Sequence, residues 1–210
     1  QIGAVICGND FVGGLVGFAS GSKLVLLGII FAAVSMLYIV AFETFSKFFK
    51  AVLKNQYLIM AVGGGIVALL TLVLQSNEYL GTGTSQIPDL LFVSAPWYVF
   101  LLKILFTAVS LGAGFKGGEI APAMFVGASL GSFLAPMFGL PIPLVVACGM
   151  AAVFCGVTNS PITAIVFSVE LFGASQIYYT MICVAVSYLI SEYFSIYKTQ
   201  KIMYSKYSTT

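Results

Sequence analysis

A glutamate and a lysine stand in a glycine-rich segment that separates two strongly apolar stretches of this chain. The segment reads LGAGFKGGEIAP from residue 111 to residue 122 and contains Lys116 and Glu119. No charged residue occurs between Ile120 and Val169. In hydrocarbon, a break in regular backbone is tolerated only where it is buried in protein or lines an aqueous cavity, and an ionisable residue there is a functional candidate by default. Glu119 is therefore the residue whose chemistry most needs an explanation.

The backbone of this break is suited to holding an anion. Its four glycines, at positions 112, 114, 117 and 118, let the chain turn tightly and approach a ligand, and Pro122 suits the first turn of a following helix. The start of a helix presents unpaired N–H groups and a partial positive charge. The amides of Glu119, Ile120 and Ala121 are therefore candidate anion donors. Packing alone would explain the glycines, but it gives no reason for a glutamate.

Composition places these segments in a membrane. The chain is 60% hydrophobic and 8% charged, with a mean hydropathy of +1.07, whereas a soluble domain has about 25% charged residues. Three apolar runs approach the roughly 20 residues that a spanning helix needs, namely 24–42, 57–75 and 177–191 with its flanks. The period-2 alternation of a membrane β-barrel is missing. We therefore expect an all-α integral membrane fold, with residues 1–210 forming a single transmembrane domain.

Four other apolar segments are interrupted. Residues 96–113 contain Lys103, and three short segments separated by proline and glycine cover residues 121–137, 143–156 and 161–172. A second polar break, Thr158-Asn159-Ser160-Pro161, opens the last of them. Transporters use half-length helices to direct helix ends at a site near the midplane. We therefore expect a multi-span bundle with short, broken helices, in which the small residues 127–132 serve helix packing.

Several function classes are excluded by composition. The chain has no histidine and no CxxC pair, which argues against nucleophilic catalysis, a zinc site and redox work. A net charge of +2 without a basic stripe argues against nucleic acid as a partner. We therefore expect neither an enzyme nor a bound cofactor or metal.

Three strings carry a family resemblance. GFKGGEIAPAMFVGASLG resembles the glycine-rich break and following helix of the CLC family of anion channels and anion/proton antiporters, whose usual form is GGxFxPxxxxGxxxG. TNSPITAIVFSVELFG and SIYKTQKI resemble two later segments of that family, and residues 79–83 resemble a loop that precedes them. The resemblance implies the second inverted repeat of a CLC-type fold. It also implies a homodimer, for which we expect the small and apolar faces of residues 24–42 and 162–191 to form the contact.

Two motifs of that family are missing from this sequence: the serine-bearing GSGIP loop and the GREGP or GKEGP segment with its gating glutamate. The sequence also begins with glutamine rather than methionine. We therefore expect a fragment, the second repeat plus the end of the first, that transports only together with the missing N-terminal repeat.

The resemblance also suggests which residues hold the anion. It implies Glu119 and Ile120 as amide donors and Tyr197 as a hydroxyl donor, with Tyr204 as an alternative match to the family's tyrosine. A glutamate at this position resembles the fluoride-exporting branch, although Ala121 stands where that branch commonly has threonine. Lys116 would attract anions at a vestibule or pair with Glu119, unless it is a surface charge.

A carboxyl beside an anion site suggests coupling to protons. Burial raises the pKa of a carboxyl. A protonated Glu119 would donate a hydrogen bond to fluoride, whereas an ionised one would compete with the anion for the amides. The expected function is CLC-type transport of chloride or fluoride coupled to protons, in a bacterial inner membrane. A passive chloride channel of this family and an unrelated broken-helix transporter are the alternatives.

Overall fold

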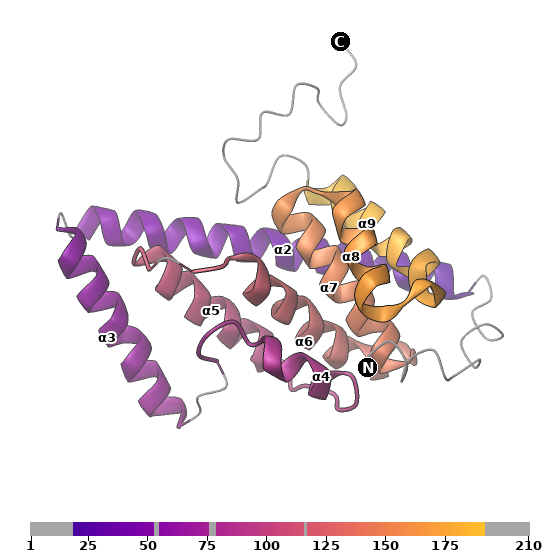
Figure 1. Cartoon of the computed structure of the whole chain (residues 1–210), viewed down its shortest axis with the longest axis horizontal. Coiled ribbons are helices and arrows are strands. Elements are labelled where there is room, and N and C mark those ends of the chain that lie inside the picture. Colours follow the sequence, from indigo (N-terminus) through magenta and orange to yellow (C-terminus); the bar gives the residue numbers. More distant parts are fainter. Residues whose placement is uncertain (1–18, 53–54, 76–78, 116, 192–210) are drawn as a thin grey trace, which may run out of the picture.

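A computed structural model describes residues 19–52, 55–75, 79–115 and 117–191, which form helices joined by turns (Figure 1). The first half contains α2 (Ala19–Val52), α3 (Gln56–Leu74), η2 (Thr84–Gln86), α4 (Ile87–Leu90) and α5 (Tyr98–Gly112). The second half contains α6 (Ile120–Phe138), α7 (Ile142–Thr158), α8 (Pro161–Phe172), η3 (Ala174–Gln176) and α9 (Ile177–Ser191). These described ranges contain no strand, and the expected all-α fold class is confirmed.

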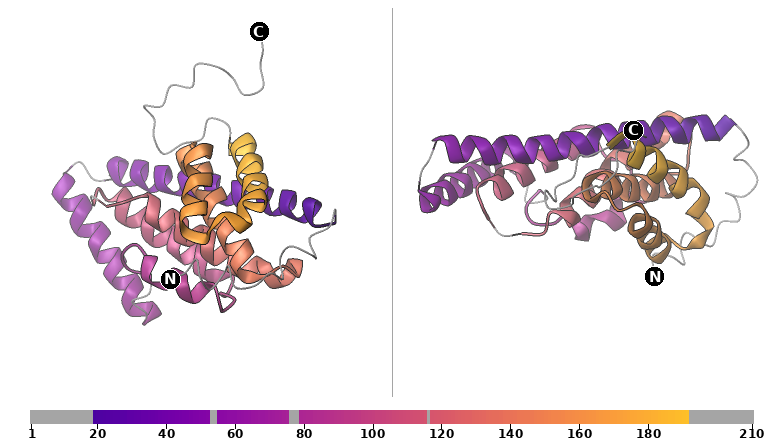
Figure 2. Two further views of the ribbon diagram at one scale, coloured as in Figure 1. Left: turned by 45° about the vertical axis from the view of Figure 1, so that its right-hand side comes forward. Right: turned by 90° about the horizontal axis from the view of Figure 1, so that it is seen from above.

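Helix α7 is the centre of the bundle. Every residue from Leu144 to Thr158 is buried. The helix packs against α6, α2, α9 and α8, and Figure 2 shows α2 running along one face of this group. A helix that is apolar on all sides is stable here only when protein surrounds it, since it has no polar face to offer to water. Because α7 is fixed on several sides, it is a rigid support for the helices that lean on it.

Glycines bring α6 unusually close to α7. A Cβ atom at Gly127 would overlap the backbone of Gly149, and one at Gly131 would overlap the backbone of Val145. Such close approach is how membrane helices gain packing contacts in the absence of a hydrophobic driving force. The prediction that these small residues serve packing is confirmed. Because these contacts with α7 fix the body of α6, they also fix the position of its first turn.

Four helices of the described chain are long and apolar enough to cross a membrane: Gly21–Val52, Gln56–Leu74, Ile120–Phe138 and Ala174–Ser191. The third corrects the expectation that residues 121–137 form a half-length helix. Its glycines do not interrupt α6, because α7 packs against them. Pro136 lies in the last turn, so the one backbone hydrogen bond that it removes is close to the end of the helix. Helices α7 and α8, with 17 and 12 residues, are short as expected.

Helix α2 also extends further than its apolar run. It continues ten residues beyond Phe42, to Val52. In this extension, Lys47 Nζ forms an ion pair with Glu43 Oε2 at 3.0 Å, one helical turn away. Pairs at this spacing support an exposed helix. Hydropathy therefore located the end of the apolar run at Phe42, but it did not locate the end of the helix at Val52.

Candidate functional site

The break between α5 and α6 is a turn with a defined start and end. Helix α5 ends at Gly112, and Gly114 adopts φ +88°, a left-handed conformation that favours glycine. The Gly114 amide donates to the carbonyl oxygen of Leu111 at 3.0 Å, and the Phe115 amide donates to that of Ser110 at 3.3 Å. Lys116 lies outside the described residues. The predicted break is confirmed, and its glycine at 114 has the conformational role that the sequence suggested.

The three predicted anion donors stand together at the start of α6. Glu119 is the N-cap residue, and its side chain makes no capping hydrogen bond. Ile120 and Ala121 are the first two residues of the helix, where backbone N–H groups lack an intrahelical partner. Pro122 follows as the third residue and has no N–H. Among the described residues, the N–H groups without an intrahelical partner at this helix start are therefore those of Glu119, Ile120 and Ala121.

A tyrosine that the sequence analysis did not single out fixes this helix start. Tyr38 on α2 donates from Oη to the backbone carbonyl oxygen of Glu119 at 2.9 Å. The tyrosine is only 2% exposed. Because the bond uses the carbonyl oxygen, it leaves the carboxyl and the N–H groups of the helix start available. A phenolic hydroxyl inside an apolar run was the only signal of this contact, since a buried tyrosine usually finds a hydrogen-bond partner.

The second polar break lies at the same end of the bundle. Asn159 ends α7 in a left-handed conformation with φ +57°, and its amide donates to the carbonyl oxygen of Cys155 at 2.7 Å. The side chain of Ile120 packs against a buried cluster drawn from the end of α7, from α8 and from α9, made of Ala151, Phe154, Cys155, Ala164 and Val184. The starts of α6 and α8 therefore gather near the end of α9. Tyr197, six residues past that end, lies outside the described residues.

The carboxyl of Glu119 is partly withdrawn from water. It stands just before α6, outside the spanning segments, and partial withdrawal from water raises the pKa of the Glu119 carboxyl above its ordinary value. Within the described ranges, no lysine forms an ion pair with it. A carboxyl with a raised pKa keeps its proton to a higher pH than an ordinary carboxyl does. In this arrangement it stands next to three backbone donors. It can bind an anion in its protonated form and repel one in its ionised form.

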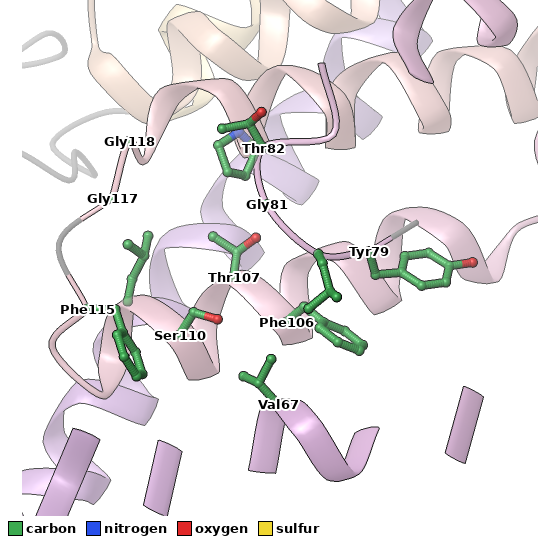
Figure 3. A pocket seen from close by; sticks show the side chains of 13 residues that line it. Val67, Tyr79, Gly81, Thr82, Phe106, Thr107, Ser110, Phe115, Gly117 and Gly118 are labelled. Carbon is green, nitrogen blue, oxygen red and sulfur yellow. The ribbon is translucent and has the colours of Figure 1, made fainter. Parts of the chain in front are cut away.

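A cavity of about 180 Å³ opens beside the break. It lies between the loop at residues 79–82 and one face of α5, and Gly117 and Gly118 form part of its wall (Figure 3). The hydroxyls of Thr107 and Ser110 point into it (Figure 3). The cavity thus adjoins the candidate donors without including their side chains.

Known proteins with similar sequences cover most of this chain. A sequence profile described as voltage gated chloride channel matches residues 13–192. A chloride/fluoride channel protein of Pseudomonas syringae pv. tomato is 36% identical over 190 residues, which are 87% of this chain and 42% of that protein. An H(+)/Cl(-) exchange transporter ClcA of Yersinia pestis is 28% identical over 172 residues, which are 75% of this chain and 36% of that protein.

A solved structure has the same arrangement of helices. The crystal structure of a CLC-type fluoride/proton antiporter is 34% identical, with a TM-score of 0.84 over 89% of this chain and 47% of that chain. The chain therefore spans less than half the length of the proteins that it matches. Over that span, the expected CLC-type fold is confirmed.

Replacing Tyr38 with phenylalanine tests whether its hydroxyl fixes the start of α6. Loss of one net hydrogen bond of about 1 kcal/mol is expected to speed amide exchange at residues 123–126, the first amides of α6 with intrahelical partners, by about five-fold. Hydrogen exchange read by mass spectrometry, on the intact natural protein in detergent, measures it. Tyr178→Phe is the matched control, because Tyr178 is 76% exposed on α9. Equal exchange in the two variants would contradict the assignment.

Proposed function

We propose, because the chain belongs to the voltage-gated chloride channel family, that it contributes to a transmembrane pathway for a small anion, chloride or fluoride, exchanged for protons. The observation that carries this proposal is the start of α6. There, three backbone donors and a carboxyl without a capping or ion-pair contact in the described chain stand side by side. Structural capping would have joined the carboxyl to the helix N–H groups. This chain covers less than half the length of the similar proteins. The proposal is therefore made for the intact natural protein.

The anion is held by hydrogen bonds rather than by a fixed cation. The amides of Glu119, Ile120 and Ala121 donate to it, and the partial positive charge of the helix start attracts it. The hydroxyl of Tyr197 is the fourth donor, as the resemblance of SIYKTQKI implies. Neutral donors suit a transported ion, because a full counter-charge would bind it too tightly for release. Lys116 remains a predicted vestibule charge.

Coupling to protons follows from the two states of Glu119. The protonated carboxyl donates a hydrogen bond to the anion, whereas the ionised carboxyl repels it and competes for the same N–H groups. Anion affinity is therefore highest below the raised pKa of Glu119 and falls as pH increases through it. A passive chloride channel has no use for this alternation, which is why we favour exchange over the channel reading.

Fluoride is the anion that the glutamate suits best. It is small and strongly hydrated, so its release from water needs strong donors close together, and a protonated carboxyl is a stronger donor than an amide. Among the similar proteins, one is a chloride/fluoride channel protein and one structure is that of a fluoride/proton antiporter. Ala121 supplies an amide but no hydroxyl at the second position of α6. We place the protein in a bacterial inner membrane, since the described chain has four helices that could span a membrane and the Pseudomonas and Yersinia relatives are bacterial proteins.

A homodimer is expected from the exposed apolar faces of the last helices. Ile162, Val166 and Tyr178 are each more than half exposed. Ile162→Trp is expected to weaken the dimer, because a bulky ring at a two-fold contact clashes with its own copy. Leu72→Trp on α3, at a site that is 77% exposed, is the control for contact with lipid. Chemical cross-linking in liposomes measures dimers, and recovery of monomers alone from the natural protein would refute the expectation.

Replacing Glu119 with glutamine tests the coupling. Glutamine keeps the size of the side chain and a hydrogen-bond donor but removes the titration. Anion flux is expected to continue, while its dependence on a pH gradient falls toward zero. Liposome efflux of fluoride and of chloride, with and without a pH gradient, measures both coupling and selectivity.

Asp89→Asn is the control for this variant, because Asp89 is an exposed carboxyl on α4. It is expected to leave the coupling unchanged. Full proton coupling in Glu119→Gln would refute the role of this carboxyl. A marked preference for chloride in the natural protein would instead refute the choice of fluoride and leave the family unaffected.

Tyr197→Phe removes one hydroxyl donor. A net loss of about 1 kcal/mol is expected to weaken anion affinity about five-fold. Isothermal titration of the intact protein with fluoride measures it. Tyr204→Phe is the matched variant, since Tyr204 is the alternative match in the sequence. A loss in Tyr204→Phe with none in Tyr197→Phe would move the assignment to Tyr204.

A further inference from the structure

One face of α5 carries three polar side chains in an otherwise apolar helix. Lys103, Thr107 and Ser110 are spaced four and three residues apart, so at about 100° per residue they fall within roughly 60° of one another around the helix axis. Thr107 and Ser110 face the cavity beside the glycine break, and Lys103 contacts the loop that forms its other wall. Polar side chains inside a membrane bundle are costly and usually mark a pathway.

Lys103 gives this face a positive charge. It is fully buried, and its Nζ donates to the carbonyl oxygens of Gly81 at 2.9 Å and Tyr79 at 3.2 Å. The same atom lies 5.1 Å from the ring centroid of Phe125. No carboxylate in the described part of the chain pairs with it. Carbonyl dipoles and a ring face stabilise an ammonium but do not cancel its charge.

The cavity lining offers two hydroxyl groups that can act as hydrogen-bond donors. Thr107 is only 8% exposed, yet neither its hydroxyl nor that of Ser110 has a hydrogen-bond partner among the described residues. Both hydroxyls point into the cavity (Figure 3). No acidic side chain lines it, and the carbonyl oxygens of Tyr79 and Gly81 are engaged by Lys103. Because both hydroxyls reach the cavity, each can donate a hydrogen bond to a water or to an anion that occupies it.

We propose that this cavity is an anion subsite, in which Thr107 and Ser110 donate to a halide and Lys103 supplies the attracting field. The proposal rests on the proposed function, because it places a second ion beside the donors at the start of α6. With about 180 Å³ of space and about 30 Å³ for each water, the cavity has room for an anion that keeps several waters. An ion would thus lose part of its hydration there before it reaches the donors at the start of α6.

Bromide is the probe that tests the subsite, because its anomalous scattering identifies it in crystals of the intact natural protein. A bromide peak is expected within hydrogen-bond distance of Thr107 Oγ1. Thr107→Val keeps the shape of the side chain and removes the hydroxyl, so the peak is expected to disappear, and Thr107→Ser is expected to restore it. Thr71→Val on α3 is the matched control, since that hydroxyl already donates to the carbonyl oxygen of Val67 at 2.8 Å.

Solution binding keeps the test independent of any single variant. Ser110→Ala is a smaller change that is expected to weaken bromide affinity about five-fold at the cavity, as read by isothermal titration. A cavity that holds only water in the natural protein, or a bromide peak that persists in Thr107→Val, would overturn the subsite. Anion flux with an empty cavity would leave the proposed function standing. Bromide in the cavity of a protein that moves no anion would leave the subsite standing and overturn the proposed function.

Discussion

The unpaired N–H groups at the start of α6 are the constraint on which the rest of the site depends. A backbone donor that loses water without gaining a partner costs several kcal/mol, so a helix start that is partly withdrawn from water needs something polar to face it. Side-chain capping would satisfy these donors, but the carboxyl of Glu119 does not cap the helix. The hydrogen bond that Tyr38 of α2 donates to this residue goes to its carbonyl oxygen. The helix start is thus fixed in position while its donors stay available.

That arrangement needs a rigid support. The glycines of α6 press against the backbone of α7, and α7 is buried from Leu144 to Thr158. A helix held along its length cannot easily tilt, so its first turn stays where the donors are needed. The tight packing of Gly127 and Gly131 is therefore connected with the site, although neither residue is part of it. Preorganised donors lose less free energy on binding than donors that must first be ordered.

Two charged residues in this region have opposite environments. Lys103 is fully buried and engaged by two carbonyl oxygens and a ring, which holds the loop at residues 79–82 against α5. Glu119 is only partly buried, and its carboxyl is left without a capping bond or an ion pair in the described chain. A charge whose partners are all internal stabilises one conformation. A carboxyl without such partners can change its protonation state without disrupting the fold, which is the property that exchange requires.

The sequence by itself determined the class of the protein and the position of its breaks. Apolar composition requires helices, because every backbone group in a membrane must be paired within its own segment, and the glycines and prolines at residues 112–122 and 158–161 mark where those helices stop. The same reasoning misjudged α6 as half-length and ended α2 at the edge of its apolar run, since hydropathy does not record what a neighbouring helix covers. The roles of Tyr197 and Lys116 stay predictions. Tyr38, Lys103 and the cavity were decided by tertiary structure alone: their contacts join residues 22 to 81 positions apart, and no local pattern specifies which distant carbonyl a hydroxyl or an ammonium will meet.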